Sequence, residues 1–83
     1  MKCQTIMAIS IDNRQADAPK FQELITRYGC LIKTRIGLHQ IDSCAEDGLI
    51  ILQICGDEVQ IKALAEEINS LESARAQWMM LDF

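Results

Sequence analysis

At 83 residues, the chain has room for one domain with a small core. Hydrophobic residues make up 49% of it, which excludes a disordered tail, and the net charge of −4 argues against a general nucleic-acid binder, which needs a basic face. We therefore expect a single globular domain over residues 1–83 that gains stability by associating with a second copy of itself.

The N-terminal segment and the cysteines bear on where the protein works. Polar residues Gln4, Thr5 and Ser10 interrupt the apolar run expected of a signal peptide, and no apolar stretch is long enough to span a membrane. The four cysteines, at positions 3, 30, 44 and 55, form no CxxC pair. We therefore predict a cytoplasmic protein that makes no contact with membranes and keeps its cysteines as reduced thiols.

The first predicted elements are a strand and a helix. The strand is expected over about Gln4–Ile11, where apolar residues occupy both faces, as in the interior of a sheet. The helix follows over about Ala18–Tyr28, with Asp17 as its cap and Pro19 in the first turn, where no hydrogen bond is lost. Gly29 is expected to end it in the left-handed conformation. At the spacing of one helix face, the buried residues should be Phe21, Leu24, Ile25 and Tyr28.

The alternation of apolar and charged residues predicts the next strand, over about Leu31–Leu38. Ile32, Ile36 and Leu38 are expected on one face. Lys33 and Arg35 are expected on the other, a pattern typical of a half-buried edge strand.

A polar loop, 39–47, leads to the second half of the chain. A strand over about Leu49–Cys55 is again apolar on both faces. A helix then begins after Asp57, and Gln60 lies three residues later, as in a capping box. The last strand is expected over about Arg75–Leu81. The buried stripe of this helix should be Ile61, Leu64, Ala65, Ile68 and Leu71.

The order β-α-β-β-α-β predicts a ferredoxin-like α+β fold. Right-handed crossovers give a four-stranded antiparallel sheet in the order 4-1-3-2, with both helices on one face. The other face has no helix to cover it, and an exposed apolar sheet face usually marks an interface, so we expect a homodimer or a dimer of dimers. Depending on register, that face carries either Ile50, Leu52 and Ile54 or Leu49 and Ile51.

Short motifs along the whole chain carry a resemblance to a known family. They are Ile9-Ser10-Ile11, Asn13-Arg14, Ala18-Pro19-Lys20, Tyr28-Gly29, Ile32–Leu38 and Asp57-Glu58. On these motifs the chain resembles a family of small, single-domain ACT-like proteins described as regulators of the iron-only hydrogenase system. The fold also resembles the C-terminal domain of the nickel-responsive repressor. The resemblance implies a regulatory module that senses a small ligand and is not an enzyme.

The resemblance to ACT domains places ligand contacts around the start of the first helix. Where ACT domains usually carry Pro-Gly, this chain has Pro19 and Lys20, so a charged side chain replaces an open approach to the backbone. A helix N-terminus with lysine beside it favours a small anionic metabolite. The end of the second strand of a neighbouring subunit is expected to contribute. The candidate ligand-binding residues are Asn13, Arg14, Asp17, Pro19, Lys20, Arg35 and Gly37.

Two other functions stay open. A purely structural protein–protein assembly domain needs the same oligomer but no ligand. A metal sensor would use His39 and Cys44, because imidazole and thiolate bind nickel, zinc or copper, but two ligands do not make a site. We therefore expect no metal and no cofactor. Catalysis is not expected either, because Cys30 and Cys55 lie in or beside apolar runs, as core cysteines do.

Overall fold

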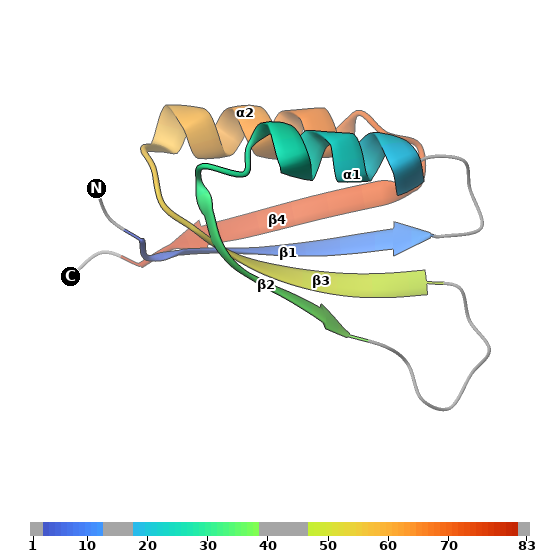
Figure 1. The fold of residues 1–83 in the computed structure, drawn as a ribbon, viewed down its shortest axis with the longest axis horizontal. Helices are drawn as coiled ribbons and strands as arrows, with labels where there is room; N and C mark the ends of the chain where they lie inside the picture. Colours follow the sequence, from blue (N-terminus) through green and yellow to red (C-terminus); the bar gives the residue numbers. More distant parts are fainter. Residues whose placement is uncertain (1–2, 13–17, 39–46, 82–83) are drawn as a thin grey trace.

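The computed structural model describes residues 3–12, 18–38 and 47–81 (Figure 1). Its elements are β1 (Thr5–Asp12), α1 (Ala18–Arg27), β2 (Ile32–Leu38), β3 (Asp47–Ile54), α2 (Glu58–Asn69) and β4 (Ala74–Met80). All strand pairs are antiparallel, and the sheet order is β2-β3-β1-β4, which is the predicted order read from the opposite edge. Both helices lie over the same face of the sheet (Figure 1). The predicted ferredoxin-like α+β fold is confirmed, with β1 and β3 in the centre.

The core lies between the sheet and the two helices. The predicted stripe of α2 is confirmed over Ile61–Ile68, whereas Leu71 follows the helix and is only partly buried. The stripe of α1 is confirmed except for Tyr28, which also follows its helix and is partly buried. Neither helix of the described segments is long and apolar enough to cross a membrane. The largest fully buried apolar side chains are Met7, Ile9, Phe21, Leu52, Ile54, Ile61, Leu64 and Ile68.

The two helices begin as predicted, but α1 ends differently. The capping box of α2 is present: the backbone N–H of Gln60 donates to Asp57 Oδ1 at 2.9 Å, and the backbone N–H of Asp57 donates to Gln60 Oε1 at 3.2 Å. Pro19 lies in the first turn of α1. The predicted left-handed stop at Gly29 is wrong, because its φ is not positive. Its N–H donates to the Thr26 carbonyl at 3.1 Å, and the helix ends in a tight turn. The predicted cap, Asp17, lies outside the described residues.

A β-bulge near the start of β2 changes which side chains share a face. Ile32 pairs with Ile54 of β3, but Thr34 pairs with the adjacent Gln53, so Lys33 is the extra residue. One extra residue reverses the alternation. Ile32 therefore lies on the helix-covered face, where it packs against the core, and Ile36 lies on the uncovered face. The prediction that these two residues share a face is wrong, although the edge position of β2 is confirmed.

The register also decides which apolar set of β3 faces away from the helices. Ile50, Leu52 and Ile54 are buried in the core, so Leu49 and Ile51 lie on the uncovered face. Their cross-strand neighbours point the same way. Together they form an apolar surface that we call the open-face patch: Ile6, Ala8, Ile36, Leu38, Leu49, Ile51 and Met79.

Candidate functional site

The predicted ligand site falls at the end of the sheet where β1 leads into α1 (Figure 1). Pro19 and Lys20 are both exposed in the first turn of α1, and Arg35 and Gly37 are exposed on β2. Around Gly37 there is open space, since a Cβ added there would have no heavy atom within 4 Å. The other predicted residues, Asn13, Arg14 and Asp17, lie outside the described residues.

The structure separates the two described cations of this site. Arg35 Nη1 donates to Gln22 Oε1 of α1 at 3.1 Å. Lys20 instead lines a shallow groove of about 200 Å³ between the helices, together with Glu23 and Glu67. Residues two apart on a helix point to roughly opposite sides, so Lys20 and Gln22 diverge. Within one chain, Lys20 and Arg35 are therefore not brought together, and Arg35 can join Lys20 only from a second subunit.

A polar cluster at the end of α1 ties the two helices together. The Tyr28 hydroxyl donates to Glu67 Oε2, and Arg27 Nη1 donates to Glu67 Oε1 at 3.1 Å. Arg27 also pairs with Glu23 at 3.5 Å. The hydrogen bond to Glu67, helped by burial, raises the pKa of Tyr28 because the carboxylate holds the phenolic proton. The exposed ion pairs contribute little to the free energy of unfolding. The cluster therefore serves to position the two helices and does not form a reactive site.

The cysteines differ from the sequence prediction. Cys3 and Cys55 form a disulfide, so the prediction of reduced thiols is wrong for this pair. Cys30 is free and exposed rather than part of the core. His39 and Cys44 lie outside the described residues. Within the described segments, no group of three or more His, Cys, Asp or Glu side chains is arranged to hold a metal ion.

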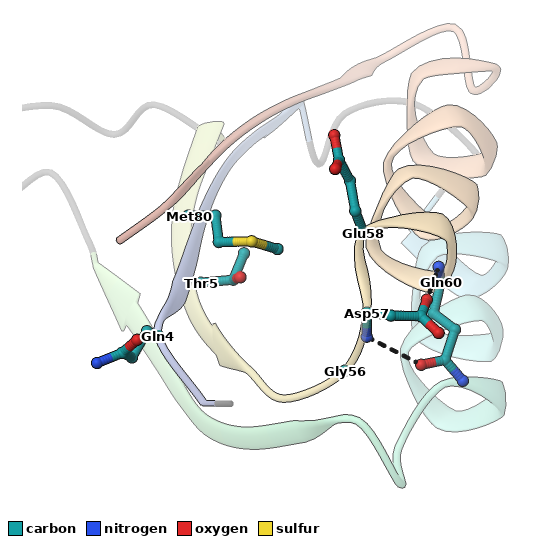
Figure 2. Close-up of a pocket in the computed structure, with 7 residues that line it drawn as sticks. All are labelled: Gln4, Thr5, Gly56, Asp57, Glu58, Gln60 and Met80. Atoms are coloured by element: carbon teal, nitrogen blue, oxygen red, sulfur yellow. Dashed lines mark hydrogen bonds between the residues drawn. The ribbon is translucent and has the colours of Figure 1, made fainter. Parts of the chain in front are cut away.

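A pocket of about 380 Å³ opens at the start of α2, at the opposite end of the sheet from the predicted site (Figures 1 and 2). Its walls come from the beginning of β1, the end of β4 and the turn between β3 and α2. Sequence reasoning identified the helix cap here but missed the pocket, because its walls come from three separate stretches of chain. The lining residues are Gln4, Thr5, Gly56, Asp57, Glu58, Gln60 and Met80.

Covalent and backbone links hold these walls together. The Cys3–Cys55 disulfide joins the residues just before β1 to the end of β3. The N–H of Leu81 donates to the Gln4 carbonyl at 2.9 Å, which ties the end of β4 to β1. Gly56 makes the turn into α2 with a φ of 145°, a conformation that favours glycine. The pocket is therefore built on constrained backbone.

The side chains that line the pocket differ in whether they make hydrogen bonds or ion pairs with neighbouring residues. Asp57 and Gln60 hold each other in the capping box. Thr5 is only 2% exposed, and Figure 2 shows it pointing with Met80 from the strands toward α2, while Gln4 points away. Within residues 3–12, 18–38 and 47–81, the buried side-chain atom without a hydrogen-bond partner is Gln4 Oε1, and the Glu58 carboxylate has no ion-pair partner. Among the charged groups that line the pocket, the exposed Glu58 carboxylate is thus the one not held by a neighbour.

Replacing Gly56 with alanine should destabilise the fold. The added Cβ would lie 3.0 Å from Gln60 Oε1 and 3.3 Å from Leu31 Cδ2, at a φ that L-residues rarely adopt. We expect a loss of about 1–3 kcal/mol in the free energy of unfolding, measured by urea denaturation. The matched control is Gly37→Ala, where the space is open and the change should stay within about 0.5 kcal/mol. Equal stabilities for the two variants would contradict the geometry described for Gly56.

Comparison with known proteins identifies the fold. Neither a protein-family model nor a curated relative matches the sequence. The structure is similar to that of the uncharacterized protein TM1266 from Thermotoga maritima, with a TM-score of 0.85 and 20% identity over 94% of this chain and 95% of that one. It is also similar to SnoaB, a cofactor-independent oxygenase from Streptomyces nogalater, with a TM-score of 0.52 and 9% identity over 99% and 96% of the two chains. At these identities, the likeness shows a shared fold alone.

Proposed function

We propose that this protein is a small ACT-like regulatory module that acts as a homodimer assembled through the open-face patch. The patch is the observation that supports the proposal. Ile36, Leu38, Leu49 and Met79 are apolar, yet between 42% and 57% of each is exposed, and they lie on the face that no helix covers. Contiguous apolar surface of this kind is uncommon on monomers and typical of interfaces.

The composition of the uncovered face suits a second copy of the same chain. Its apolar residues are accompanied by polar ones, which include Thr34 and Gln53, hydrogen-bonded to each other at 3.0 Å. Arg75 also lies on this face, since it pairs with Ser10, the neighbour of Leu49. An apolar centre with a polar rim is the usual anatomy of a protein interface. Two such sheets can pack face to face at about 10 Å, and a two-fold axis makes one patch complementary to itself.

The ligand in this proposal is a small anionic metabolite held near the start of α1. Lys20 supplies an exposed positive charge in the first helical turn, where free backbone N–H groups also favour an anion. Arg35 of a second subunit would complete the site. A role in an iron-only hydrogenase system rests on the motif resemblance alone.

A structural assembly domain without a ligand is the second candidate. Lys20 and Arg35 diverge within one chain, so a single chain presents no assembled anion site. This favours an assembly domain, which needs no such site. The metal sensor based on His39 and Cys44 ranks third, since a site needs more ligands than these two.

Light scattering combined with amide-shift mapping tests the proposal. At about 10 μM, where a micromolar interface is largely formed, we expect a molar mass of twice the 9.4 kDa of one chain. Carboxylate and phosphate metabolites should shift the amides of Lys20 and its neighbours in the first turn of α1. A 9.4 kDa monomer contradicts the homodimer. A dimer in which no anion shifts these amides supports the assembly domain instead.

A further inference from the structure

The open-face patch has a raised half and a hollowed half. Three of its four strongly exposed apolar side chains, Ile36, Leu38 and Leu49, lie on β2 and β3, which form one side of the sheet. On the other side, formed by β1 and β4, a cavity of about 220 Å³ opens. We call it the Ala8 hollow. Its lining residues are Ile6, Ala8, Gln77, Trp78 and Met79.

The hollow exists because a short side chain occupies the middle of the sheet. Ala8 belongs to a cross-strand row whose other members are all longer, so its single methyl group forms a floor between them. Met79 stands at the rim, and its flexible thioether can adapt to a side chain that enters. Read across the sheet from β4 to β2, the row is Gln77, Ala8, Ile51 and Ile36. The hollow and the raised Ile36 therefore share one row, on opposite sides of the midline between β1 and β3.

The charge of this face favours a second copy over a strongly charged partner. Neither the row of Ala8 nor the adjacent row, which runs from Met79 to Thr34, contains a charged residue. Arg75 lies further along β4, and its Nη1 donates to the carbonyls of Leu71 and Ala74 at 3.2 and 2.6 Å. An acidic or basic partner would find no counter-charge at the centre of the face, whereas a second copy brings the same uncharged surface.

The area of the face is also sufficient for a dimer. Four strands about 4.8 Å apart, with seven residues at about 3.3 Å each, cover roughly 440 Å² in projection. Two copies together cover about 900 Å², and the accessible area of protruding side chains exceeds the projected area. A specific interface needs roughly 1,000 Å². The face is therefore large enough for a dimer of modest affinity.

The shape of the face distinguishes two directions of the two-fold axis. When two sheets pack with aligned strands, the axis runs either across the strands or along them. An axis across the strands places each strand over its own copy, so the raised halves collide and the hollows stay empty. An axis along the strands, between β1 and β3, keeps each row level and places β2 and β3 of one chain over β1 and β4 of the other. Empty apolar space forfeits dispersion contacts, so the second direction is favoured.

We propose that the Ala8 hollow receives Ile36 of a second copy, so that each homodimer contains two such contacts related by an axis along the strands. This inference rests on the proposed function, because it requires the homodimer. It adds the geometry of the interface and the reason for its selectivity. A partner must present a raised apolar side chain and a hollow in the same row, and a second copy of this chain does so.

Exchanging the two residues tests the proposal. Ala8→Ile fills the hollow, so a pair of such chains has two clashes, and its dissociation constant should rise about a hundredfold. Ile36→Ala leaves both hollows empty and should raise the dissociation constant about 10- to 100-fold. Light scattering over a dilution series of the full chain measures both. Each substitution lies on an exposed face of the single chain, so both variants should keep the wild-type circular dichroism.

A mixture of the two variants should restore the dimer. One contact then joins the two substituted positions, with the original total volume, and the other contact is native. We expect a heterodimer with a dissociation constant within about threefold of the wild-type value. Native mass spectrometry should show it in clear excess over the half that random pairing gives. The matched control is Leu38→Ala, which removes a similar volume from the same strand and face but from the next row. Mixed with Ala8→Ile, it should not restore the dimer.

Two results overturn this inference and leave the homodimer standing: a wild-type affinity of Ala8→Ile for itself, or equal pairing of Ala8→Ile with Ile36→Ala and with Leu38→Ala. A wild-type protein that stays monomeric overturns the proposed function as well and leaves the face to a different partner. Melting temperatures, measured alongside, show whether a loss of pairing reflects unfolding. If Ala8→Ile is destabilised, the smaller Ala8→Val repeats the test with the same expected rescue.

Discussion

Replacing Ile36 with lysine should convert the homodimer into a folded monomer. Ile36 lies in the open-face patch, paired with Ile51, and 49% of it is exposed in the single chain. A two-fold interface contains the substitution twice. Two buried ammonium groups should together cost at least about 3 kcal/mol, which is roughly a hundredfold increase in the dissociation constant. Light scattering over a dilution series measures this change.

The matched control is Val59→Lys. Val59 is also an exposed β-branched residue, at 78% exposure, but it lies on α2, away from the open-face patch. This variant should remain dimeric. Far-UV circular dichroism should show the same fold for both variants, because each site is exposed in the isolated chain. If Ile36→Lys stays dimeric at the concentration where Val59→Lys does, the interface is not on this face.

Loss of the Cys3–Cys55 disulfide should have the largest effect on stability. The two cysteines are 52 residues apart in the sequence, so the bond removes much of the freedom of the unfolded chain. For a loop of this length, we expect a loss of about 3–4 kcal/mol in the free energy of unfolding. The melting temperature should fall by roughly 12–30 °C. Cys3→Ser is the preferred variant, because Cys55 is 3% exposed and a serine there would bury a hydroxyl.

Two measurements check this prediction. A thiol assay on unfolded, unreduced protein should detect two of the four cysteines, because Cys30 and Cys44 remain outside the disulfide. Cys30→Ser serves as the stability control and should change the free energy of unfolding by less than about 0.5 kcal/mol, since Cys30 is exposed. Four reactive thiols in the unreduced protein, or equal stability of Cys3→Ser and Cys30→Ser, would rule out a stabilising disulfide.

The fold was predictable because local signals and chain topology agree. Apolar residues on both faces identified β1 and β3 as central strands, and the spacing of Phe21, Leu24 and Ile25 identified the buried face of α1. The capping box at Asp57 was visible as a four-residue pattern. Each of these features depends on residues close together in the sequence, and the right-handed crossover rule then leaves few arrangements.

The candidate sites were less predictable. Arg35 is expected to join Lys20 from a neighbouring subunit, and this stays a prediction. Whether the two also meet within one chain depends on helix phase, and there the structure directs Arg35 to Gln22 while Lys20 lines the groove between the helices. The disulfide was missed because Cys3 and Cys55 flank β1 and β3, two strands whose register the sequence does not state.

By itself, the amino-acid sequence determined the element order, the two helix faces, the start of α2 and the central position of β1 and β3. Only the tertiary structure decided which apolar set of β3 is left uncovered, where Ile36 points after the bulge, and that Thr5 faces the turn at Gly56. The physical reason is that a one-residue shift reverses the face of every side chain in a strand, and a pocket exists only where distant segments close around it.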